Sequence, residues 1–232
     1  MALLEGAPLW AGIDIGSTTT KLVVYDPTSK GILHSQYKRH HAAQKKSVLE
    51  ALKLLAERFP NKSFKLAMTG SGSKPIAKIL GLPFVQEVVA NSIALKKNYP
   101  NVNTAIELGG QDAKMIFFSR EDGQLKTRDM RMNGSCAGGT GAFIDEVASI
   151  LKVPIEDFDN VASRGKCVYD ISGRCGVYAK TDIQPLLNSG IAKEDLALSA
   201  FHAIAKQTIG APTKAKQASP PPSPPKEPPN RF

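Results

Sequence analysis

Long apolar runs and cysteines are both scarce in this chain of 232 residues. No apolar stretch approaches the ~18–20 residues that a membrane-spanning helix needs, and the N-terminal MALLEGAPLW lacks the basic start and long apolar core of a signal peptide. The three cysteines, Cys136, Cys167 and Cys175, are too few for a secreted disulfide framework and suit metal or redox chemistry. The sequence therefore predicts a soluble, cytoplasmic protein of one or two domains with no membrane partner.

A basic stripe with interleaved aromatic residues is also missing, although 30 Lys and Arg against 21 Asp and Glu give a net charge of +9. Residues 211–232 hold 8 of the 16 prolines, and their four basic residues and one Glu contribute +3. We expect this tail to be disordered or polyproline II-like, without helix or sheet. The remaining charge is scattered over amphipathic stretches typical of solvated helix faces. The charge therefore predicts no nucleic-acid partner.

The order of apolar segments predicts an α/β fold built from two similar copies with mixed sheets. Three strands follow one another from Trp10, and a helix follows them, with Ser47 and Glu50 forming a capping box. The same order of three strands begins again at Asn103. No final strand and helix remain to complete the second sheet. Further elements are expected at 65–68 (strand), from Pro75 (helix), and at 88–97, 142–151 and 193–208 (helices). We expect subdomains at 9–102 and 103–210, the second incomplete.

The first candidate site is the segment GIDIGSTTTKLVV, residues 12–24. Asp14 ends a buried strand and can hold a hydrated Mg²⁺, while amides and hydroxyls of the following turn make a phosphate-sized nest of donors. An ordinary hairpin is the alternative. No GxxxxGK[ST] motif occurs, and Lys21 is interpreted as a strand-edge lysine. The turn residues are Gly16, Ser17, Thr18 and Thr19.

The second candidate site repeats this pattern in the second copy, where a strand-terminal acid is again followed by glycines and polar side chains. Two such hairpins facing each other would clamp a triphosphate and its metal from both sides. The repeat therefore favours a nucleotide site over two ordinary hairpins. Its residues are Glu107, Gly109, Gly110, Gln111 and Asp112.

The third candidate site is NGSCAGGTGAFIDEVA, residues 133–148, in which a glycine-rich turn directly precedes a helix. The amides of Gly138, Gly139, Thr140 and Gly141 can reach phosphate at that helix N-terminus. Cys136 lies just before this turn, and Cys175 stands in a similar turn in SGRCGVYAKTDIQPLL. Both cysteines suit metal binding, with two buried, reduced thiols as the alternative.

Cys167 and the four histidines are weaker candidates for metal binding. Cys167 is expected on a strand as a small buried hydrophobe. A zinc site is disfavoured because the four histidines show no C-x₂-C…H-x₃-H spacing.

Together, GIDIGSTTTK, ELGGQDAK, SCAGGTGAF and RCGVYAKTDIQPLL resemble the BadF/BadG family of ATP-dependent activators of 2-hydroxyacyl-CoA dehydratases, over about residues 9–209. The resemblance implies an actin-like ATPase fold, with two ribonuclease H-like subdomains around a nucleotide cleft. It also implies ATP and Mg²⁺, with Asp14, Glu107 and Asp112 positioning the metal and the attacking water and Gln111 contacting the γ-phosphate.

The same resemblance implies that Cys136 and Cys175 of two protomers share one 4Fe-4S cluster across a homodimer interface. ATP hydrolysis would then drive a low-potential electron to a dehydratase partner, with ferredoxin or flavodoxin as donor. The alternatives are a sugar-type kinase of the same fold and a non-catalytic fragment. Because no glycine-rich adenosine turn follows Thr208, we also expect weak ATP binding by this chain.

Overall fold

The structure, a computed structural model, describes residues 6–132, 138–174 and 176–217. It divides into two compact units, residues 1–142 and 143–232. This division rests on packing density and leaves the expected subdomain boundary at 102/103 a prediction. No helix within the described ranges is both long and apolar enough to cross a bilayer.

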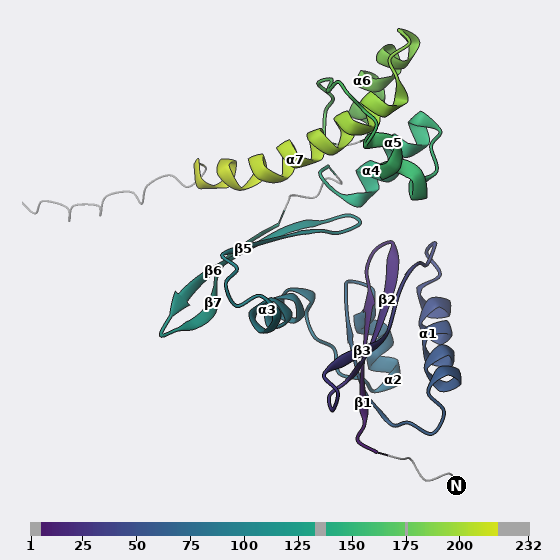
Figure 1. The fold of residues 1–232 in the computed structure, drawn as a ribbon, viewed down its shortest axis with the longest axis vertical. Coiled ribbons are helices and arrows are strands. Elements are labelled where there is room, and N and C mark those ends of the chain that lie inside the picture. The colour runs from purple at the N-terminus through teal and green to yellow at the C-terminus, as the bar shows by residue number, and fades with distance from the viewer. Residues whose placement is uncertain (1–5, 133–137, 175, 218–232) are drawn as a thin grey trace, which may run out of the picture. The chain divides into compact units, whose positions relative to one another are not determined.

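The first unit begins with a four-stranded mixed sheet, ordered β3-β2-β1-β4 (Figure 1). β1 pairs antiparallel with β2 and parallel with β4, and β2 pairs antiparallel with β3. Alternate residues of β1 are buried, as the period of a half-buried strand requires. The three expected strands from Trp10 are confirmed. The strands are β1 (Leu9–Ile15), β2 (Thr19–Asp26), β3 (Gly31–Arg39) and β4 (Phe64–Thr69).

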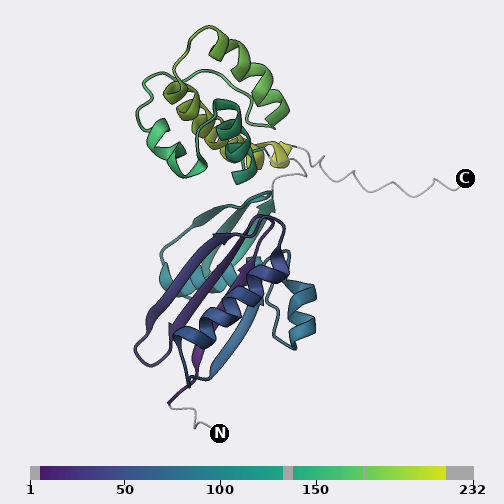
Figure 2. The same cartoon turned by 90° about the vertical axis from the view of Figure 1, so that its right-hand side faces the viewer.

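Helices α1 (Gln44–Arg58) and α2 (Ser73–Leu80) contribute side chains to one core beneath this sheet. Figure 2 shows α1 lying across the sheet face. The core joins inward-facing residues of β1 and β2 to one face of each helix, as amphipathic periodicity requires. Its fully buried members include Ile13, Ile15, Leu22, Val24, Val48 and Ala77.

The expected capping box at Ser47 is wrong. α1 begins at Gln44, three residues earlier, and the Ser47 amide donates to the Ala43 carbonyl at 3.0 Å, as an interior helical residue does. Glu50 instead accepts from Lys38 Nζ of β3 at 2.6 Å. The turn from β3 positions this helix without a side-chain cap.

A three-stranded antiparallel sheet, ordered β5-β6-β7, completes the first unit. It follows α3 and confirms the second run of three strands expected from Asn103. Within it, Glu107 of β5 lies directly opposite Lys114 of β6. The elements are α3 (Glu87–Asn98), β5 (Thr104–Leu108), β6 (Ala113–Glu121) and β7 (Gln124–Met132).

The second unit is helical, and its core contains Phe143, Leu151, Phe158 and Leu196, all at most 1% exposed. The ring of Phe158 meets that of Phe201 edge to face, with centroids 5.6 Å apart. The helices are α4 (Gly141–Leu151), η1 (Ile155–Asp157), α5 (Phe158–Ala162), α6 (Gly176–Asn188) and α7 (Lys193–Gln217).

Two expectations fail in this unit. Cys167 is exposed and lies in an irregular segment between α5 and α6, not buried on a strand. The amides of Lys166 and Cys167 donate to Asp195 Oδ1 of α7, at 2.7 and 3.0 Å, so a helix side chain takes the hydrogen bonds that a neighbouring strand would take. These two bonds lower the pKa of Asp195.

The tail was expected to be non-helical from residue 211, but α7 continues to Gln217. Pro212 costs one backbone hydrogen bond, whereas Ala, Lys and Gln in the rest of that stretch are good helix formers. The tail expected at 218–232 lies outside the described residues.

The core beneath the first sheet gives a direct stability test. Ile13 is completely buried, so Ile13→Ala should lower the free energy of unfolding by about 2–5 kcal/mol through lost burial and a residual cavity. Ile32→Ala, at a side chain 66% exposed on β3, is the control and should have a much smaller effect. Urea denaturation of both variants measures the difference, and equal losses would contradict the assigned core.

Candidate functional site

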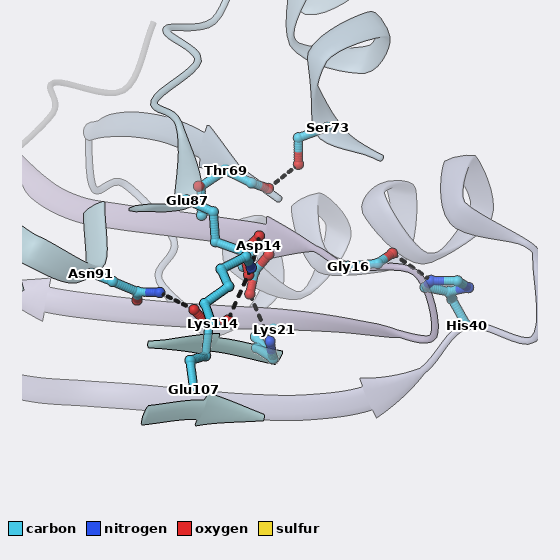
Figure 3. Close-up of polar contacts among 10 residues, drawn as sticks. All are labelled: Asp14, Gly16, Lys21, His40, Thr69, Ser73, Glu87, Asn91, Glu107 and Lys114. Carbon is cyan, nitrogen blue, oxygen red and sulfur yellow. Dashed lines mark hydrogen bonds and ion pairs between the residues drawn. The ribbon is translucent and has the colours of Figure 1, made fainter. Parts of the chain in front are cut away.

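Asp14 stands near the end of β1, opposite Lys21 of β2 in the antiparallel register. Lys21 Nζ and Asp14 Oδ2 lie 2.7 Å apart (Figure 3). Burial alone would lower the pKa of Lys21, but the hydrogen bond and charge of Asp14 outweigh burial and raise it. Lys21 is therefore the charge partner of Asp14, a role that its interpretation as a strand-edge lysine missed.

The other oxygen of Asp14, Oδ1, is buried and has no hydrogen-bond partner among the described residues. Gly70, at φ +93°, lies so close that a Cβ there would overlap both Asp14 Oδ1 and the Ile15 carbonyl. An orphaned, buried carboxylate oxygen is costly, and a bound cation or donor would satisfy it. Asp14 thus has the donor chemistry that Mg²⁺ prefers.

The turn from Gly16 to Thr19 is closed by the Gly16 amide, which donates to the Thr19 carbonyl at 2.9 Å. Ser17 and Thr18 are half-buried, and Thr19 is buried. The turn therefore presents two hydroxyl side chains from a fixed backbone.

The second turn lies directly against the first. A Cβ on Gly110 would stand 2.5 Å from Thr18 Oγ1 and 2.9 Å from Ser17 Oγ, distances that real Cβ atoms do not show. Gly109 closes its own turn by donating its amide to the Asp112 carbonyl at 2.8 Å. The first two turns therefore lie against each other within the first unit, and the clamping of a triphosphate between them stays a prediction.

The third turn docks on the second. The Gly141 amide donates to the Gly109 carbonyl at 2.9 Å, and the Ala142 amide donates to the Gly110 carbonyl at 2.8 Å. The first two amides of α4 thus join the glycine turns, and the Gly141 amide is engaged by protein. Gly138, Gly139 and Thr140 precede it as a buried turn, with Gly139 at φ +75°. All three motifs accordingly meet at Gly109 and Gly110.

Glu107 belongs to a partly buried polar cluster that the sequence reasoning did not anticipate. Lys114 Nζ lies 2.9 Å from Glu87 Oε2 and 3.4 Å from Glu107 Oε1. Asn91 Nδ2 donates to Glu107 Oε2 at 2.6 Å. Figure 3 shows Asn91 and Lys114 beside Glu107, with Asn91 hydrogen-bonded to it. Glu87 and Asn91 carried no sequence signal, because both stand on α3, outside any glycine-rich motif.

The pKa values of the two carboxyls in this cluster are shifted in opposite directions. Burial, the hydrogen bond with Glu87 and the negative charge of Glu87 raise the pKa of Glu107 above its ordinary value of 4.5. Burial would also raise the pKa of Glu87, but hydrogen bonds from Glu107 and Lys114 outweigh it and lower that pKa. Of the two carboxyls, Glu107 is therefore the one that binds a proton more readily, and Glu87 the one that ionises more readily beside Lys114.

The structure says less about the remaining candidate residues, Gln111, Asp112, Cys136 and Cys175. The side chains of Gln111 and Asp112 are exposed at the second turn. Cys136 and Cys175 lie outside the described residues, and within the described ranges no three His, Cys, Asp or Glu side chains are grouped as a metal site.

The mixed sheet, the second three-stranded sheet and the paired hairpin turns define an actin-like ATPase fold. A solved structure of this fold is the Acidaminococcus fermentans (R)-2-hydroxyglutaryl-CoA dehydratase component A. It aligns with a TM-score of 0.74 and 26% identity, covering 93% of this chain and 81% of that chain.

The particular family follows from the sequence comparison. The chain belongs to the BadF/BadG/BcrA/BcrD ATPase family, whose model matches residues 11–219. The (R)-2-hydroxyglutaryl-CoA dehydratase activating ATPase of Acidaminococcus fermentans is 29% identical over 201 residues, which are 86% of this chain and 75% of the relative. The 2-hydroxyisocaproyl-CoA dehydratase activator of Clostridioides difficile is 30% identical over 108 residues, 47% of this chain and 40% of the relative.

The contact between the first two turns predicts a glycine requirement. Gly110→Ala should separate the turns and cost about 1–3 kcal/mol of stability, because the added methyl group overlaps Thr18. Gly12→Ala, where an added Cβ meets nothing within 4 Å, is the matched control. Urea denaturation measures both variants. If Thr18→Ala does not relieve part of the Gly110→Ala penalty in a double-mutant cycle, the contact is wrongly assigned.

The carboxyl cluster predicts an unusual titration. The pKa of Glu107 should lie above 4.5, the ordinary pKa of a glutamate. The stability that the protonated form contributes should therefore decrease as pH rises through the folded-state pKa. In Glu107→Gln that loss should disappear. Carbon-13 NMR of the glutamate carboxyls follows the titration directly. A Glu107 midpoint at or below the ordinary value would contradict the cluster.

Proposed function

We propose that this protein is an ATP-dependent activator of a 2-hydroxyacyl-CoA dehydratase, hydrolysing ATP to deliver a low-potential electron from a 4Fe-4S cluster to that enzyme. Membership of the ATPase family supports nucleotide hydrolysis. Two relatives named as an activating ATPase and an activator of such dehydratases support the partner class. The observation that carries the proposal is the meeting of three glycine-rich turns at Gly109 and Gly110.

The phosphates of ATP would lie against these turns. In the first turn, Ser17 and Thr18 supply hydroxyl donors beside Gly110. Asp14 would hold Mg²⁺ through its buried, orphaned oxygen, while Lys21 balances the other. Phosphoryl transfer needs mostly positioning and charge neutralisation, which these groups are placed to provide.

In this proposal Glu107 and the second turn handle the attacking water. Water attacks the γ-phosphorus, the bond to the ADP oxygen breaks, and the proton of the water goes to Glu107. A carboxylate whose pKa is raised toward neutrality is a better proton acceptor than an ordinary one. The exposed side chains of Gln111 and Asp112 would contact the γ-phosphate and the hydrated metal.

The cluster is proposed for Cys136 and Cys175, which precede α4 and α6 in the sequence. An iron–sulfur cluster of this type takes four thiolates and, when bound, supplies one-electron redox chemistry. One chain offers two cysteines in such positions, so two chains would share the cluster as a homodimer. Ferredoxin or flavodoxin is the proposed electron donor, and a reducing cytoplasm is the compartment that such thiols need.

The coupling between the two sites has a physical basis in α4. Its first two amides are bonded to the carbonyls of Gly109 and Gly110, and Cys136 stands four residues before Thr140 in the sequence. A displacement of the second turn on ATP binding therefore pulls on the start of the helix that follows Cys136. Such a mechanical link lets one site bias the other.

Nucleotide hydrolysis is tested at Asp14. Asp14→Asn should lower kcat for MgATP by about 10²-fold or more, because the metal loses a charged ligand beside the reacting phosphate. Asp26→Asn is the control. Asp26 is the last residue of β2, at the end away from the turn, and it accepts a hydrogen bond from the Thr28 amide. Phosphate release, followed with and without a 2-hydroxyacyl-CoA dehydratase, is the measurement. Equal activity in both variants would contradict the role of Asp14.

The cluster is tested by substituting the cysteines in anaerobically purified protein. Cys136→Ala and Cys175→Ala should each abolish bound iron and sulfide, because a shared four-thiolate site loses two ligands per dimer. Cys167→Ala should keep both, since this thiol is exposed in the segment tied to Asp195. Iron and sulfide analysis with visible absorbance decides, and equal loss in all three variants would refute the assignment.

A further inference from the structure

His40 is a buried histidine that the proposed chemistry does not use. It follows the last residue of β3 and is 5% exposed. Its ring nitrogen Nε2 lies 3.1 Å from the Gly16 carbonyl oxygen (Figure 3). A carbonyl oxygen can only accept, so Nε2 must carry the hydrogen of this bond. Nδ1 is buried and has no partner in the part of the chain that the structure describes.

The backbone of His40 makes a second bond to the same turn. Its amide donates to the Thr18 carbonyl at 3.2 Å. One residue therefore holds the turn at both ends, with its ring on Gly16 and its amide on Thr18. The side chains of Ser17 and Thr18, which face Gly110, are attached to the backbone between these two bonds.

The chain after His40 is strained in a way that fixes its place. His41 and Ala42 adopt φ values of +46° and +63°, the left-handed region that residues with a Cβ rarely occupy. The Ala43 amide closes this bend by donating to the His40 carbonyl at 2.7 Å. Two consecutive strained residues persist where the surrounding structure over-determines them. Here the bend carries the chain from β3 into α1 while leaving His40 against the turn.

We propose that His40 is a positioning residue for the phosphate-binding turn, holding the Gly16–Thr19 backbone in the conformation that receives a nucleoside triphosphate. This inference rests on the proposed function, because it assigns His40 to the same site. His40 acts through Gly16 and Thr18. The unpaired Nδ1 agrees with this role. If position 40 served packing alone, an apolar side chain would fill it without the cost of burying an unpaired nitrogen.

The test compares His40→Leu with His40→Gln in the full chain, using MgATP as the probe. Leucine fills similar space without a donor, whereas the glutamine amide can replace the Nε2–H donor to Gly16. His40→Leu should raise the dissociation constant and KM for MgATP about five- to tenfold, the size of one lost hydrogen bond. His40→Gln should recover most of that loss. The exposed neighbour provides the control, and His41→Leu should leave MgATP binding unchanged.

Two measurements keep the outcome clear if His40→Leu is unstable. Nitrogen-15 NMR of the unmutated protein should show His40 as the Nε2–H tautomer. Amide exchange in His40→Gln should keep residues 16–19 as protected as in the parent.

The possible failures are distinct. If the parent binds no MgATP, the proposed function falls and this inference with it. If the parent binds MgATP and folded His40→Leu binds it equally well, or if glutamine gives no recovery, only the role of His40 is overturned. The Nδ1–H tautomer would also overturn it, because Nε2 could not then donate to Gly16.

Discussion

The close approach of Gly110 to Ser17 and Thr18 is the constraint on which the candidate site depends. It brings together two hairpin turns from separate sheets, with the side-chain oxygens of Ser17 and Thr18 lying where a Cβ on Gly110 would stand. The carbonyls of Gly109 and Gly110 then accept the first two amides of α4. Backbone approaches of this kind require glycine. The glycine at position 110 is therefore explained by its contact with the first turn as well as by any ligand.

The charged side chains around this contact lie in partly buried groups of opposite charge. Lys21 accompanies Asp14, and Lys114 accompanies Glu87 and Glu107. Partly buried carboxylates are tolerated where a cation and hydrogen bonds compensate them. Among the residues that the structure describes, one Asp14 oxygen has no hydrogen-bond partner. An unsatisfied acceptor beside phosphate-sized donor turns is the feature that best fits a nucleotide with its metal.

The succession of strands along the chain was largely predictable, because each strand is marked by a pattern in its own residues. The alternating burial of β1 and the glycines flanking it predict a half-buried strand, and the same pattern after Asn103 predicts β5 to β7. Contacts made across the fold were harder to predict. Ser47 and Glu50 satisfy a capping rule in sequence, but the bend at His41 and Ala42 starts α1 three residues earlier. Cys167 is exposed in an irregular segment, where Asp195, 28 residues away, binds its amide.

In the candidate site, too, the residues within local motifs were predictable and those brought in by long-range contacts were not. Asp14, Glu107 and the turn glycines are visible from motif spacing, since each follows or ends an apolar strand. Glu87, Asn91 and His40 are not, because each reaches the site from an element that carries no motif of its own. Lys114 lies within a recognised motif, yet its partners come from two other elements. Long-range polar contacts depend on packing, which a single sequence does not display.

The central claim is that the three glycine-rich turns form one phosphate-binding site. Titrating the protein with MgATP while following backbone amide shifts by NMR tests it most directly. We expect residues 16–19, 109–112 and 138–141 to shift together and to yield one common dissociation constant. Shifts confined to a single turn, or three unrelated constants, would contradict it.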